Sequence, residues 1–133
     1  MKLDFIDTKY LYEHARLRNK VTGQPFDIWV DEFGKNRNVQ HNDPRYKVTA
    51  NGIEIDIILH KNDDIEFVND SSEIRKFSFG KQAVKFIYKF KDVLRMQWNQ
   101  EIDTYELGTI IRLVEIQGYD MNTAIDKVIN GDF

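Results

Sequence analysis

His41 and Asp43 come nearest to a catalytic pair in this sequence. An imidazole close to a carboxylate can act as a general base that the acid orients. The alternative is structural, because polar side chains in a His-Asn-Asp-Pro run often hydrogen-bond the backbone of a loop before the proline fixes it. The sequence signals no nucleophile nearby. We therefore predict no catalytic residue and favour a non-enzyme, with His41 and Asp43 as the candidates if there is a reaction.

Residues that could bind a metal are scattered. A site built from His41, His60 and Asp63 would depend on the fold to bring these side chains together. Asp63, Asp64, Glu66 and Asp70 surround a turn, but they lack the spacing, central glycine and terminal glutamate of a calcium loop. Cysteine is absent, which excludes disulfides and thiolate metal sites. We expect no metal and no cofactor.

A basic stripe lies on one side of a predicted helix and consists of Lys81, Lys85, Lys89 and Arg95. Between Arg75 and Arg95 there are seven Lys or Arg and one acid. Together with Arg45, these side chains could contact the phosphates of a nucleic acid. The helical count turns Phe86 and Phe90 toward the core, so these rings cannot stack on bases. Nucleic-acid binding is therefore the alternative function.

The segment that follows is acidic. From Glu101 to Asp132 there are seven acids against Arg112 and Lys127, and the whole chain has a formal net charge of -3. The basic and the acidic segment can contact each other, or they can form two surfaces of opposite charge.

The elements that must position these residues begin with a hairpin. Asn51-Gly52 predicts a type I′ turn, which needs positive φ at both central residues. Counting outward from this turn pairs Ala50 with Ile53, Thr49 with Glu54, Val48 with Ile55, Lys47 with Asp56, and Tyr46 with Ile57. In this register apolar residues face apolar ones and Lys47 faces Asp56, so the register is well specified.

Other patterns extend the sheet and begin the chain with a helix. The alternation in "FDIWVDEF" predicts a strand, and "IEFV" predicts a short strand after the turn "HKNDD". Thr8 can cap a first helix within residues 1–22, where Leu11, Tyr12 and Ala15 share one face. Three large apolar side chains, Trp29, Phe33 and Ile58, fall on the sheet face away from the helices and could form a patch.

The residue pattern of the second half of the chain predicts helices. Residues 81–98 carry an apolar stripe made of Ala83, Ile87, Phe90, Leu94 and Trp98. Asp103 or Thr104 begins a second helix that Gly118 ends, and a third helix runs from Met121 until Gly131 closes it. We expect one α+β domain over residues 1–133: a small antiparallel sheet of three or four strands within 23–70, packed on helices of a C-terminal half within 80–133.

One stretch resembles a known family. The residues His41, Pro44, Tyr46 and Val48 are similar to the H-x-P-P-H-F-H-V hairpin of the bacterial domain-of-unknown-function family 4160, and Trp98-Asn99 resembles its helix ending. The similarity covers about Phe26 to Asn99. It implies a hairpin followed by a long helix, and association with toxin–antitoxin systems or mobile elements. Two of the family's three histidines are replaced by Arg45 and Lys47, whose charge would repel a divalent metal, so no histidine cluster is transferred.

The tail carries a second, fainter likeness. Its sequence "LVEIQGYDMNTAIDKVINGD" resembles the helix, Gly-aromatic turn and helix of ubiquitin-associated domains, with Gly118-Tyr119 at the turn. This resemblance implies that Tyr119 is exposed and contributes to binding a protein partner.

We therefore expect a cytoplasmic, non-enzymatic interaction or regulatory protein of bacterial, phage or mobile-element origin. Its partner would be a protein, bound through Trp29, Phe33, Ile58 or Tyr119, and one concrete form is an inhibitor of a defence or nucleic-acid-handling system. The alternative is a nucleic-acid-binding or toxin–antitoxin component that uses the basic stripe and His41. A homodimer is compatible with both, and the short apolar runs predict no membrane span.

Overall fold

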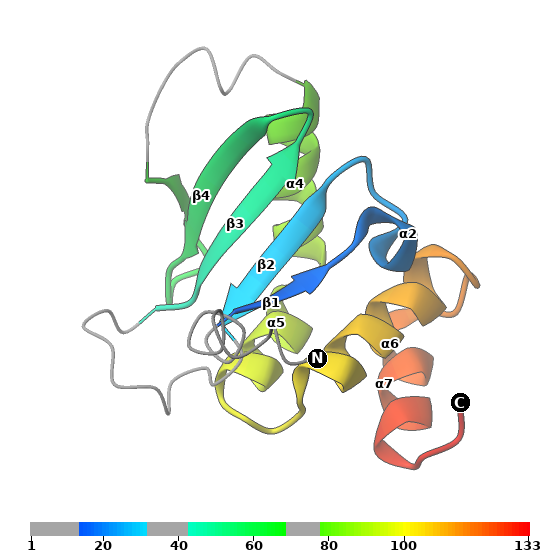
Figure 1. Cartoon of the computed structure of the whole chain (residues 1–133). Coiled ribbons are helices and arrows are strands. Elements are labelled where there is room, and N and C mark those ends of the chain that lie inside the picture. Colours follow the sequence, from blue (N-terminus) through cyan, green and yellow to red (C-terminus); the bar gives the residue numbers. More distant parts are fainter. Residues whose placement is uncertain (1–13, 32–42, 69–77) are drawn as a thin grey trace, which may run out of the picture.

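A computed structural model describes residues 14–31, 43–68 and 78–133. It has an α+β architecture (Figure 1), with one antiparallel sheet in the strand order β1-β2-β3-β4-β5. The strands are β1 (His14–Leu17), β2 (Asp27–Asp31), β3 (Arg45–Ala50), β4 (Ile53–Leu59) and β5 (Ile65–Phe67). The described helices are α2 (Asn19–Thr22), α4 (Ser78–Lys89), α5 (Lys91–Trp98), α6 (Thr104–Glu115) and α7 (Met121–Ile129). The predicted fold class and helical C-terminal half are confirmed.

The central hairpin has the predicted register. β3 and β4 pair from Tyr46 opposite Ile57 to Ala50 opposite Ile53. Asn51 and Gly52 both have positive φ, at 53° and 79°, as a type I′ turn requires. The inner face of this hairpin is fully buried at Val48, Ile55 and Ile57. Burial of these side chains holds the register, since a slip of one residue would turn them all to the outer face.

The prediction of an N-terminal helix is wrong over His14–Leu17, which form β1 and give the sheet a fifth strand. Ala15 and Leu17 pair with Val30 and Ile28 of β2 and face the core. A four-residue segment fits both a helical and an alternating pattern, so the available edge of β2 decides its conformation. The remainder of the predicted helix before His14 lies outside the described residues.

The helices bury their apolar stripes against one face of the sheet, where α4 lies behind the strands in Figure 1. All members of the predicted stripe are buried, from Ala83 to Trp98. The predicted single helix is however two helices, because the chain turns at Phe90, with φ -102° and ψ 17°. α4 can thus follow the sheet while α5 packs on α6. Asp103 caps α6 through a complete capping box with Glu106.

Helix α6 approaches the first strand and α2 at Gly108. A Cβ atom added there would lie 3.3 Å from Cδ2 of Leu17 and 3.6 Å from Cγ1 of Val21. The absence of a side chain therefore permits a close contact between α6 and the β1–α2 segment. Among the helices of the described residues, none has the length and apolar character of a membrane span.

Candidate functional site

His60 lies at the centre of a polar network at the β4–β5 turn. Its Nε2 is 2.6 Å from Oε1 of Glu66, and its Nδ1 is 3.2 Å from Oδ2 of Asp43. Arg95 of α5 donates from Nη2 to the His60 carbonyl oxygen at 2.7 Å, and its Nη1 lies 2.7 Å from Oδ1 of Asp63. The network therefore joins the start of β3, the β4–β5 turn and α5.

The two carboxylates favour the imidazolium form of His60. Hydrogen bonds to Glu66 and then to Asp43 raise the pKa of His60 above its ordinary value. A histidine whose two nitrogens both donate to carboxylates has no free lone pair to accept a proton. This arrangement suits an ion-pair network that holds segments together.

One further polar group, the Tyr46 hydroxyl, lies close enough to Arg95 and Asp31 to be affected by their charges. The Tyr46 hydroxyl is buried and has no hydrogen-bond partner among the described residues. Burial raises its pKa, and the Asp31 carboxylate raises it further against the opposing effect of Arg95, so the hydroxyl is a poor acid. Within residues 14–31, 43–68 and 78–133, no group of three or more His, Asp or Glu residues could hold a metal ion.

The outer face of the sheet is mixed in character. Trp29 is half-buried, the Arg16 guanidinium lies 5.3 Å from its ring centroid, and its Nε1 donates to Oγ1 of Thr49 at 3.3 Å. Ile58, also half-buried, stands between Arg45 and Glu66 in the neighbouring strands. β3 presents Lys47 between Trp29 of β2 and Asp56 of β4. Charged side chains thus divide the predicted apolar patch, and Phe33 lies outside the described residues.

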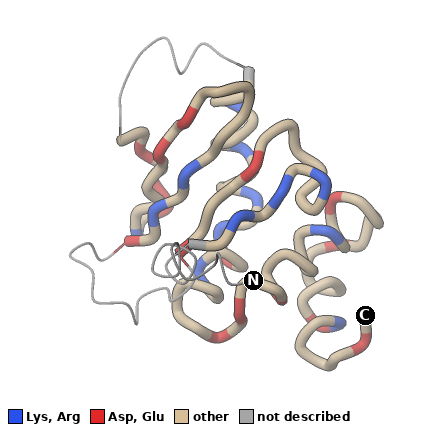
Figure 2. The backbone as a smooth tube through the Cα atoms, in the orientation of Figure 1, with Lys and Arg blue, Asp and Glu red and all other residues tan. Residues whose placement is uncertain are grey.

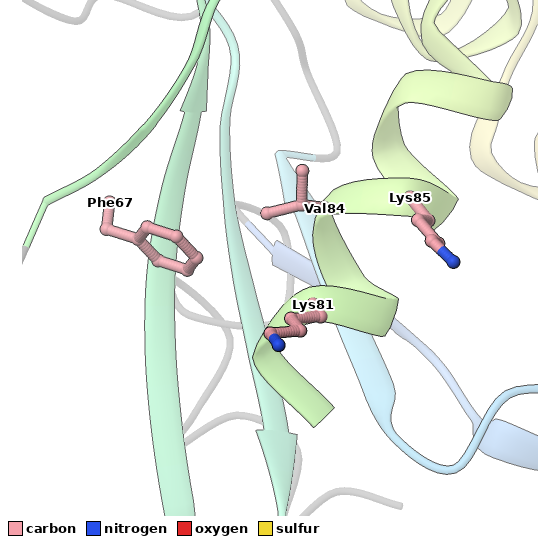
Figure 3. A pocket seen from close by; sticks show the side chains of 4 residues that line it. All are labelled: Phe67, Lys81, Val84 and Lys85. Atoms are coloured by element: carbon pink, nitrogen blue, oxygen red, sulfur yellow. The ribbon is translucent and has the colours of Figure 1, made fainter. Parts of the chain in front are cut away.

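A pocket of about 350 Å³ lies between β5 and α4 and is lined by Phe67, Lys81, Val84 and Lys85. Figure 3 shows the Phe67 ring and the Val84 side chain facing each other across it, while the Lys85 amine points away from the Phe67 ring. This volume is at the low end of the range of about 300–1,000 Å³ for small-molecule sites. The pocket could hold one or two apolar side chains of a partner, and the lysines that line it could bind an acidic residue next to them.

An exposed aromatic residue extends this surface along α4. Tyr88 is 54% exposed, and Nζ of Lys91 lies 4.6 Å from its ring centroid. Lys81, Val84, Lys85 and Tyr88 are spaced at i, i+3, i+4 and i+7, which places them on one side of the helix. We call Phe67, Lys81, Val84, Lys85 and Tyr88 the α4 face. α4 contains no Asp or Glu, so the charged positions of this helix are all blue in Figure 2.

The remaining predicted basic residues lie outside the α4 face, each for a different reason. Lys89 is exposed but forms an ion pair with Glu115 of α6. Arg95 is engaged by Asp63 and the His60 carbonyl oxygen. Arg45 is exposed on β3, opposite Ile58 on the outer face of the sheet. The structure therefore brings together only part of the predicted basic stripe.

Of the other predicted residues, Asp43 belongs to the His60 network and Tyr119 lies elsewhere on the surface. Asp43 contacts His60, a residue the sequence offered only as a remote metal ligand, while His41 lies outside the described residues. Tyr119 is 38% exposed after the turn at Gly118, and Nζ of Lys127 lies 5.1 Å from its ring centroid. Tyr88 and the Phe67–Val84 pocket were missed, although the i, i+3, i+4, i+7 spacing on α4 was a usable signal.

Comparison of this chain with protein-family models, curated proteins and solved structures finds no match.

Proposed function

We propose that this protein is a non-enzymatic interaction protein whose α4 face binds an apolar, acidic segment of a protein partner. The observation that carries the proposal is the pocket between Phe67 and Val84, with Lys81 and Lys85 beside it. An apolar side chain of the partner would enter the pocket, and its neighbouring carboxylate would contact a lysine. The two carboxylate contacts of His60 support a structural role for this ring at the β4–β5 turn.

Fluorescence anisotropy with two short labelled peptides tests this proposal. One peptide alternates Leu and Phe with Glu, and its match carries Lys at every Glu position. We expect the acidic peptide to bind, the basic peptide not to bind, and the Lys81→Glu/Lys85→Glu variant to lose about tenfold or more in affinity. Val84→Gln should weaken binding as well, because it places an amide at the pocket wall.

A matched control variant separates the effect of the α4 face from the effect of the net charge. Lys20→Glu/Lys61→Glu changes the same charge at two other exposed lysines, and it should bind the acidic peptide like the wild type. Absence of binding by both peptides at about 1 mM, or equal binding of both, would reject the proposal.

The second candidate function is binding of single-stranded nucleic acid by the same helix. The exposed Tyr88 ring among lysines is the observation that favours it, because bases stack on such rings beside phosphate-binding cations. Binding to short DNA and RNA should then fall steeply with salt and be lost in Lys81→Glu/Lys85→Glu. No binding at low salt would remove this candidate.

A further inference from the structure

A second surface, at the C-terminal end of the described chain, has the chemistry that the α4 face requires. Tyr105, Ile129 and Phe133 are large apolar residues that are 69%, 59% and 54% exposed. The rings of Tyr105 and Phe133 lie 6.5 Å apart, so they form a contiguous aromatic pair between the start of α6 and the segment after α7. An exposed aromatic pair of this kind, with Ile129 exposed on the preceding helix, is a surface that a protein partner could cover.

Acidic side chains accompany this aromatic pair. Asp126 is exposed on α7, three residues before Ile129, and the Asp132 side chain is 81% exposed next to Phe133. The nearby cation, Lys127, is only 28% exposed and lies 4.0 Å from Asp132. We call Tyr105, Asp126, Ile129, Asp132 and Phe133 the acidic patch. Its charge is opposite to that of the α4 face, and both surfaces have apolar groups between their charges.

The two surfaces cannot meet within one molecule. α4 is anchored in the core by Ala83 and Ile87, and α7 is anchored by Ala124 and Val128, all of them buried. The Lys89–Glu115 ion pair also fixes the last turn of α4 to the end of α6. In Figure 1, α4 lies behind the sheet while α7 lies well away from it beyond α6. Any contact between the α4 face and the acidic patch must therefore join two molecules.

We infer that the α4 face of one copy of this chain binds the acidic patch of a second copy. This inference rests on the proposed function and names its partner. Ile129 or Phe133 would enter the pocket at Val84, with Asp126 and Asp132 beside Lys81 and Lys85. Because the two contacting surfaces differ, the contact is heterologous and builds a chain or a closed ring of molecules. Its charge complementarity makes the association weaken as salt increases.

Sedimentation equilibrium with charge-reversal variants tests the inference. Wild-type mass should rise with protein concentration, whereas Lys81→Glu/Lys85→Glu and Asp126→Lys/Asp132→Lys should each weaken self-association by about tenfold or more. When these two variants are mixed, each supplies one intact surface, so heterodimers should form. The Lys20→Glu/Lys61→Glu variant should associate like the wild type, and circular dichroism should show that every variant is folded.

The outcomes distinguish this inference from the proposed function. A wild-type protein that stays monomeric at about 1 mM but binds the acidic peptide overturns the inference and retains the proposed function. Self-association that neither reversal weakens, or mixed variants that form no heterodimer, also overturns it. Absence of both self-association and peptide binding overturns both.

Discussion

Nε2 of His60 lies 2.6 Å from Oε1 of Glu66, across the turn that joins β4 to β5. The same ring contacts Asp43, the residue that precedes the entry to β3 by two positions. These contacts join the two sides of the β4–β5 turn to the segment before β3, and they exist at full strength only when the imidazole is charged.

The His60 network makes folding stability depend on pH. The carboxylates of Glu66 and Asp43 raise the pKa of His60 in the folded state. Its contribution to stability is therefore complete below the pKa of the unfolded state, about 6.5, and is lost as pH rises through the higher folded-state pKa. Urea unfolding of wild type and His60→Gln should show a stability difference that shrinks from acid toward alkaline pH.

A nuclear magnetic resonance titration of the imidazole provides the control. Glu66→Gln should bring the pKa of His60 back toward its ordinary value, because the largest cause of the shift is removed. A stability difference between wild type and His60→Gln that stays constant over this pH range would contradict the assigned role.

The hairpin turn depends on the absence of a side chain at Gly52. Its φ is 79°, and an added Cβ would meet no described atom within 4 Å, so Gly52→Ala introduces backbone strain without a clash. We expect the free energy of unfolding to fall by about 1–2 kcal/mol, measured by urea denaturation. Asn51→Gly also permits positive φ and should change it by less than about 1 kcal/mol. Equal losses in the two variants would contradict this reason.

The contact at Gly108 gives opposite expectations for a small and a large side chain. Gly108→Ala gains about 0.5–1 kcal/mol of helix stability, which the 3.3 Å approach to Cδ2 of Leu17 partly offsets. Gly108→Leu must displace Leu17 and Val21, so we expect it to destabilise the protein by about 1–3 kcal/mol. Thermal unfolding of both variants measures this difference. A Gly108→Leu variant as stable as the wild type would show that α2 is not held against α6.

Local signals account for the part of the fold that was predicted from sequence. The two-residue turn with positive φ determines the β3–β4 register, because the residue pairs can be counted outward from it. Asp103 and Glu106, three residues apart, form the capping box that predicts the start of α6. β1 was not predictable in this way, because Ala15 and Leu17 become strand residues through pairing with β2. Its conformation is decided by a partner strand and not by its own pattern.

The candidate sites depended still more on distant contacts. Phe67 and Val84 lie on different elements, and their shared pocket follows from how α4 crosses the sheet near β5. Asp43 was proposed as a companion of His41, which lies outside the described residues, and its carboxylate also contacts His60. Residue type identified these polar groups as candidates, but only the packing of α5 and the β4–β5 turn determines which of them meet.

Gln97 links α5 to the end of β2 and provides the last prediction. Its side chain is 1% exposed, and Nε2 donates to the Asp31 carbonyl oxygen at 2.7 Å. Gln97→Leu would keep the volume but remove the buried hydrogen bond from the Gln97 amide to that carbonyl, so we expect a loss of about 1–3 kcal/mol in urea unfolding. Gln117→Leu, at an exposed position, should change stability by less than about 0.5 kcal/mol. If both variants unfold at the same urea concentration, then this buried hydrogen bond does not hold α5 to the sheet.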